Sequence, residues 1–166
     1  MDRECNRDQL GGIHAPMPIP AFNDFGILPM GLHNCTLEEA KNFFSWNDHR
    51  VEVWERFSGF IEWAESMPKH AVLFVDGSYV TDKTLPNDVD VAIDLAGCSI
   101  ADQNLWFGDW GRRCGEFKAN FLTDSYLFVT GSGNDFSVFF QYMRVSEAME
   151  RGLDSGDSKG VLRIEL

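Results

Sequence analysis

Two strand-length segments on either side of a glycine turn restrict the fold of this chain more than any other feature. The first, residues 71–75, is a continuous apolar run that leads into Asp76-Gly77-Ser78. The second, residues 89–95, alternates apolar side chains with Asp90, Ala92 and Asp94. A short apolar run is typical of a buried strand, and alternation is typical of a strand with one face in the core. We therefore expect two strands of one sheet, the second with an apolar face and an acidic face.

The flanking segments favour helices. A capping box that starts at Thr36 predicts a helix to about residue 46, and a cap at Asp48 predicts a longer helix to about Met67. Residues 99–118 are compatible with a third helix, although three glycines weaken the pattern. Strands are expected at 121–130 and 161–166, a loop at 131–134, and a helical or extended segment at 136–143.

The first 35 residues are punctuated by glycine and proline, which excludes a long helix or a central strand there. We interpret residues 1–35 as an extended N-terminal arm that packs on a single domain of residues 36–166, since 166 residues suit one core. The expected fold class is α/β (α+β), with a short mixed β-sheet and flanking helices.

Composition limits the partners. A formal net charge of −12 disfavours anionic membranes and broad DNA or RNA binding. No apolar run approaches the ~18 residues of a membrane span, and the N-terminus does not resemble a signal peptide. The four cysteines are scattered without metal-ligand spacing, which favours a reduced, cytoplasmic location.

The acidic strand carries the strongest chemical signal. Asp88 and Asp90 project from one face because side chains alternate along a strand. Two carboxylates held close together repel unless a cation lies between them, so the pair suits Mg²⁺ or Mn²⁺. A third carboxylate on a neighbouring strand would complete such a site, and Asp124 is the candidate. Alternatively, Asp124 is a solvated residue of an edge strand and has no role in metal binding.

Residues around the glycine turn suit a nucleotide. Gly77 and Ser78 offer unobstructed backbone N–H groups and a hydroxyl to a triphosphate. Tyr79 and Tyr126 are the expected neighbours of the nucleotide, and Lys83 and Lys118 are candidates for its phosphates. A Gly-Ser turn or a solvated Asp-x-Asp alone favours a purely structural role, and only their combination points to a metal and nucleotide site.

The Gly-Ser turn followed by Asp-x-Asp resembles the DNA polymerase β-type nucleotidyltransferase superfamily. Within it, the chain is similar to a family of small bacterial nucleotidyltransferase-like proteins over most of its length. The likeness is carried by residues 18–22, 28–33, 76–81, 86–90, 139–141 and 159–162. It implies a nucleotidyltransferase-like core, with Asp88 and Asp90 as metal ligands, Ser78 as a phosphate contact and Asp124 as the third acid.

The same resemblance has departures. Minimal nucleotidyltransferases of toxin–antitoxin systems have Arg-Gly within the turn and a serine before the first aspartate, whereas this chain has Thr81-Asp82 and Asn87. Two functions are therefore expected. The first is metal-dependent transfer of a nucleoside monophosphate from ATP or another NTP to a hydroxyl of a protein or RNA acceptor, in a toxin–antitoxin or phage-defence system. The alternative is a catalytically degenerate module that binds or inhibits a protein partner.

Overall fold

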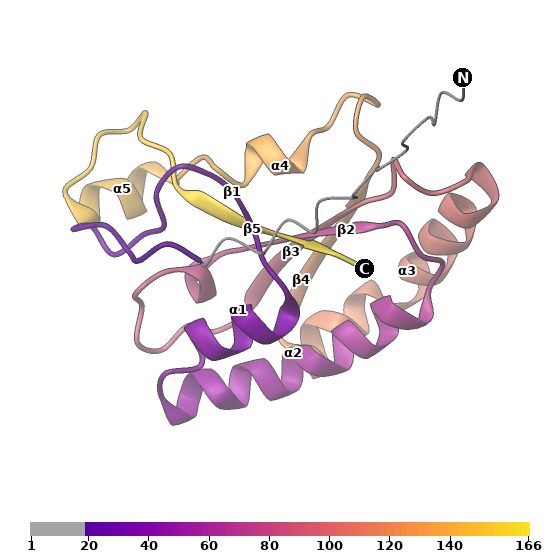
Figure 1. Ribbon diagram of the computed structural model, residues 1–166, viewed down its shortest axis with the longest axis horizontal. Helices are drawn as coiled ribbons and strands as arrows, with labels where there is room; N and C mark the ends of the chain where they lie inside the picture. Colours follow the sequence, from indigo (N-terminus) through magenta and orange to yellow (C-terminus); the bar gives the residue numbers. More distant parts are fainter. Residues whose placement is uncertain (1–18) are drawn as a thin grey trace, which may run out of the picture.

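The structure, a computed structural model, describes residues 19–166 and shows one five-stranded mixed sheet (Figure 1). The spatial order is β1-β5-β2-β3-β4. β1 is parallel to β5 and β3 is parallel to β4, whereas β2 is antiparallel to both of its neighbours. The strands are β1 (Gly31–Asn34), β2 (Val72–Asp76), β3 (Val89–Asp94), β4 (Thr123–Phe128) and β5 (Gly160–Glu165). The expected mixed α/β fold is confirmed.

Three helices match the sequence patterns closely. α1 (Leu37–Phe44) begins at the predicted capping box, in which Thr36 and Glu39 satisfy each other's backbone N–H groups. α2 (Asp48–Ser66) is capped by Asn47 and not by Asp48, because the Asn47 side chain accepts a hydrogen bond from the N–H of Arg50. α3 (Ile100–Phe121) starts after Ser99 and runs three residues beyond the predicted end.

The two faces of the sheet are covered unequally. Figure 1 shows α1, α2 and α3 together on one side, where they enclose the main core, and the short α4 (Phe136–Phe139) on the other. Under α4 lies a smaller apolar cluster formed by Phe74, Ala92, Phe128, Phe140 and Val161. Among the described residues, helices cover this second face less than the first, which leaves places on it for polar groups.

Four elements differ from the sequence expectations or add to them. Gly31–Asn34 of the predicted arm form edge strand β1, residues 78–80 form a 3₁₀ turn (Ser78–Val80), and α5 (Val145–Arg151) follows α4. The predicted closing strand, β5, lies inside the sheet between β1 and β2. Residues 1–18 of the predicted arm lie outside the described part of the chain.

The described part of the arm reaches the glycine turn. Ile27 forms a bridge with Thr81, and the N–H of Asp82 donates to the carbonyl of Gly26 at 2.9 Å. The arm thereby fixes the loop that follows the turn. Within residues 19–166, no helix is both long and apolar enough to cross a membrane.

Candidate functional site

Three aspartates form a row across three neighbouring strands. Asp76 of β2 is paired in register with Asp90 of β3, and Asp90 is paired with Asp124 of β4. Residues paired across strands place their side chains on the same face of the sheet. Val75 and Val91 point into the main core, so the row lies on the opposite face, the one that α4 covers in part. The structure thus brings Asp124 beside Asp90, as the sequence predicts.

Asp88 joins this row through the junction between α3 and β4. The N–H of Val89 donates to the carbonyl of Leu122 at 2.9 Å, which sets the start of β3 against the end of α3. Leu122 has a left-handed conformation, with φ 51°, that turns the chain directly from helix to strand. Lys118, in the last turn of α3, lies at this junction, and its Nζ is 2.6 Å from Asp88 Oδ2 and 2.5 Å from Asp124 Oδ2.

Burial and neighbouring charges shift the pKa values of ionisable groups at this site. Burial raises the pKa of Asp90 above its usual range, and the neighbouring charges of Asp88 and Asp124 raise it further. Desolvation lowers the pKa of Lys118, but its hydrogen bonds to Asp124 and Asp88 outweigh this and hold the pKa above the ordinary lysine value. The site is therefore an anionic cluster that favours a cation.

Sequence reasoning missed Lys159, which forms a buried ion pair with Asp76. Its Nζ lies 3.0 Å from Asp76 Oδ1, and both side chains are more than nine-tenths buried. Burial raises the pKa of Asp76 to about 6, although Lys159 opposes the shift. The available signal was that Lys159 precedes Val161 by two residues and so shares its strand face. The strand that this face contacts depends on the place of β5 in the sheet, which no short stretch of sequence specifies.

The glycine of the turn is required by close approach. Gly77 has φ 83°, and a Cβ at this position would lie 2.1 Å from Asp90 Oδ2. A side chain there would have to displace the Asp90 carboxylate, and a positive φ is itself strained for other residues. Ser78 follows, half-buried, as the first residue of the 3₁₀ turn. The turn therefore places a glycine without a side chain and a serine hydroxyl next to the aspartate row.

Hydrogen bonds from Arg50 of α2 fix the backbone of this turn. Its fully buried guanidinium donates to the carbonyls of Phe44, Tyr79 and Lys83. Tyr79 is also in the core, because its hydroxyl donates to the carbonyl of Arg50 and hydrogen-bonds Ser45. The side chain and the carbonyl of Tyr79 are thus not available to a ligand at the turn.

The two charged residues after the turn lie at the surface. Lys83 is exposed, and its carbonyl is the acceptor for Arg50. Asp82 is exposed as well. Its carboxylate pairs with Arg151 of α5 at 2.9 Å.

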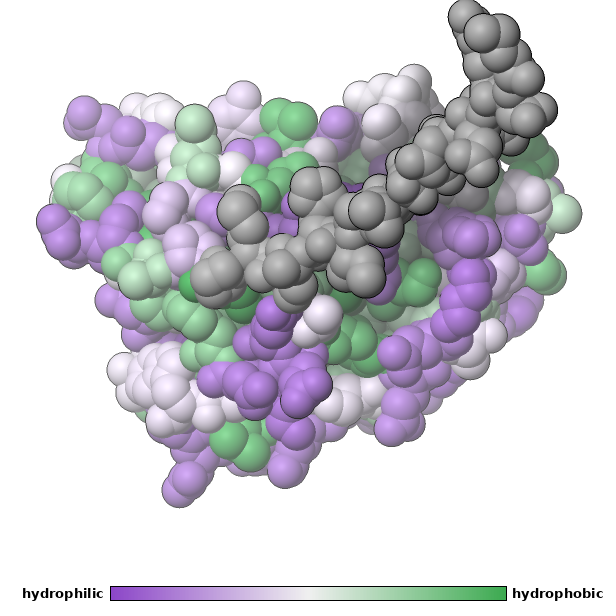
Figure 2. Space-filling model, in the orientation of Figure 1, coloured by the Kyte–Doolittle hydropathy of each residue, from purple (hydrophilic) through white to green (hydrophobic). Residues whose placement is uncertain are grey.

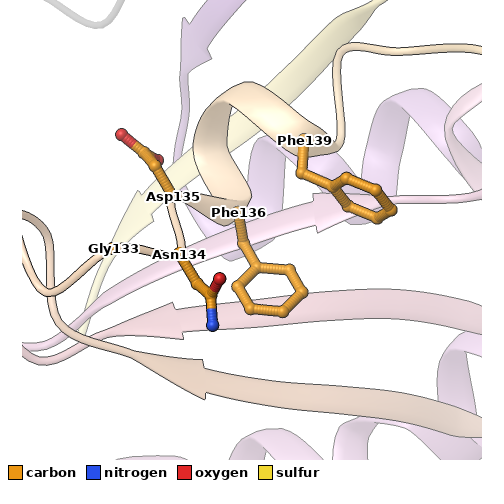
Figure 3. A pocket seen from close by; sticks show the side chains of 5 residues that line it. All are labelled: Gly133, Asn134, Asp135, Phe136 and Phe139. Carbon is orange, nitrogen blue, oxygen red and sulfur yellow. The ribbon is translucent and has the colours of Figure 1, made fainter.

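Aromatic residues adjoin the carboxylates. Tyr126, two residues beyond Asp124 on the same face of β4, is 39% exposed and stacks on Phe136 with ring centroids 5.0 Å apart. Figure 3 shows Phe136 and Phe139 of α4 lining a pocket of about 360 Å³, with Asp135 directed away from the rings. The pocket is completed by Gly133, Asn134 and Asp135. An aromatic surface of this kind can stack a planar ring.

The donor set fits a divalent cation by its chemistry. Mg²⁺ and Mn²⁺ prefer carboxylate oxygens, and the cation-favouring cluster has a lysine ammonium bridging two of its carboxylates. In the described residues as they stand, no three acidic, histidine or cysteine side chains are arranged as a finished metal-ligand group. The ammonium of Lys118 takes the place between Asp88 and Asp124.

Fold and site together define an α/β protein with an acidic row beside a glycine turn. A family model described as "Family of unknown function (DUF6932)" matches residues 20–165, and the chain belongs to this family. Neither the curated proteins nor the solved structures gave a match.

Proposed function

We propose that the protein is a metal-dependent nucleotidyltransferase that transfers a nucleoside monophosphate from an NTP to a hydroxyl. The observation that supports this most is the register of Asp90 with Asp124, next to Asp88 and in close approach to Gly77 of the turn. Acids at the ends of adjoining strands, beside a glycine-serine turn, suit a metal-bound triphosphate.

Each residue has a role in this proposal. Asp88, Asp90 and Asp124 hold Mg²⁺ or Mn²⁺, which when bound neutralises charge on the triphosphate. Gly77 and Ser78 contact phosphate oxygens. A nucleobase stacks on the aromatic surface formed by Tyr126 and α4, which begins two residues from Asp124 on β4.

The acceptor is a hydroxyl of a protein or, as a second choice, of an RNA. The net charge of −12 favours the protein, because a polyanion would be repelled. We place this activity in the cytoplasm, since the cysteines of the described chain are unpaired. A toxin–antitoxin or phage-defence system is the context that the resemblance of the turn and the Asp-x-Asp pair suggests.

The test is nucleotide binding by calorimetry with ATP, GTP, CTP and UTP, with and without Mg²⁺. We expect Mg²⁺-dependent binding of at least one NTP, and its loss in Asp88→Asn/Asp90→Asn. The matched control is Glu52→Gln/Glu55→Gln, which removes the same charge from exposed positions of α2 on the other side of the sheet. Unchanged binding in the aspartate variant would refute the metal assignment.

A second candidate is a partner-binding module without turnover. It is favoured by large apolar side chains exposed on and after α4, where hydrophobic residues reach the surface in Figure 2. They are Val138, Phe139, Tyr142, Val145 and Met149. If no NTP binds under any condition, this candidate replaces the first.

A further inference from the structure

Lys118 is held at the acidic site by the packing of α3. The preceding residue, Phe117, is fully buried against Phe60 and Trp63 of α2. Arg56 of α2 also donates to the carbonyls of Ala119 and Asn120, at the end of α3. The backbone that carries Lys118 is thus anchored on both sides, and the direction of its side chain follows from the tertiary structure.

The ammonium of Lys118 is the cation that pairs with Asp88 and Asp124 among residues 19–166. Lys159, the second lysine at the site, is engaged with Asp76 inside the sheet. Lys118 contacts Asp88 and Asp124 at 2.6 and 2.5 Å, and in the described part of the chain Asp90 forms no ion pair. One cation therefore bridges two of the three proposed metal ligands and leaves the third free.

A divalent ion and the ammonium compete for the same oxygens. An ion held by Asp88 and Asp124 needs the oxygen lone pairs to which the Nζ of Lys118 now donates, and two cations at this spacing repel. Lys118 is 48% exposed, so its side chain can leave toward solvent without disturbing the core. Release of the lysine is consequently coupled to metal binding.

We propose that Lys118 is a built-in counter-cation that occupies the place between Asp88 and Asp124 in the metal-free protein and is displaced when a divalent ion binds. The inference rests on the proposed metal site. The displaced ammonium is free to meet the triphosphate that arrives with the metal. The lysine thus keeps the aspartates together while the site is empty and lowers its affinity for metal without nucleotide.

The test measures Mn²⁺ affinity by electron paramagnetic resonance, with no nucleotide present, in the wild type and in Lys118→Met. Removing the competitor is expected to tighten Mn²⁺ binding about 5- to 20-fold, the range of a modest coupling free energy. Lys41→Met is the matched control, because it removes one charge from an exposed position of α1 and is expected to leave the affinity unchanged.

The outcomes separate this inference from the proposed function. Equal or weaker Mn²⁺ binding in Lys118→Met, with binding still abolished in Asp88→Asn/Asp90→Asn, overturns the counter-cation and leaves the metal site intact. Equal tightening in Lys41→Met also overturns it, since net charge then explains the effect. Absence of Mn²⁺ binding in both the wild type and Lys118→Met overturns the metal site itself.

A second measurement avoids reliance on the folding of the variant. The ¹⁵N and ¹H signals of the lysine ammonium groups are followed in the wild type during a Mg²⁺ titration. The signal of Lys118 is expected to move toward the position of solvated lysines as the site saturates, whereas that of Lys159 stays. A Lys118 signal that does not change while Mg²⁺ binds contradicts displacement.

Discussion

Among single residues, Gly77 is the position where the site depends most directly on the absence of a side chain. Its φ is 83°, and a methyl carbon added there would lie 2.1 Å from Asp90 Oδ2, so the Asp90 side chain would have to move. We expect Gly77→Ala to lower the free energy of unfolding by about 1–3 kcal/mol, because the new methyl must displace Asp90 and strain the backbone. Urea denaturation of both proteins measures this.

The chain offers a matched control for this substitution. Gly111 lies in α3 with open space around its Cβ position, so Gly111→Ala is expected to stabilise the protein by about 0.4–1 kcal/mol through helix propensity and reduced freedom of the unfolded chain. A Gly77→Ala variant as stable as the wild type would show that the turn tolerates a side chain.

Between elements, the Asp76–Lys159 pair links the end of β2 to the entry of β5 and makes stability depend on pH. Burial raises the pKa of Asp76 from 3.8 to about 6, so between these values the folded state binds a proton that the unfolded state releases. The free energy of unfolding is therefore expected to fall as pH rises from about 4 to about 6 and to level off above. The fall is at most about 3 kcal/mol for this group.

The measurement compares the wild type with Asp76→Asn/Lys159→Met in EDTA, by urea denaturation at several pH values. The double variant removes both charges, so that neither is left buried alone. The stability of the wild type relative to the variant should decrease over pH 4 to 6. A constant or rising difference would mean that Asp76 titrates near its ordinary pKa.

In the molecule as a whole, the C-terminal strand occupies an interior place in the sheet. β5 is hydrogen-bonded to β1 on one side and to β2 on the other, and Val161, Leu162 and Ile164 are buried. We expect its backbone amides to exchange with solvent only through global unfolding, at least about tenfold more slowly than those of edge strand β1. Native-state hydrogen exchange tests this, and fraying of β5 at the rate of a free chain end would contradict it.

Short-range sequence patterns predict much of the fold. The capping box at Thr36, the apolar run before Asp76 and the alternation after Asp88 each depend on residues close in sequence, and the structure has a helix or strand at each. The same short-range alternation predicts that Asp88 and Asp90 share a face. The exact cap of α2 was misassigned because Asn47 and Asp48 are both good capping residues, and only the geometry of Arg50 selects between them.

Local sequence patterns were enough to predict the three longest helices, most of the strands and the acidic character of β3, because periodicity and capping act over a few residues. The insertion of β5 between β1 and β2, which buries Lys159 against the distant Asp76, is a property of the assembled fold alone. The contact of Lys118, at the end of α3, with Asp88 and Asp124 is likewise a property of the assembled fold. Strand order and helix packing are set by the burial of whole apolar faces, and no local window of sequence contains that information.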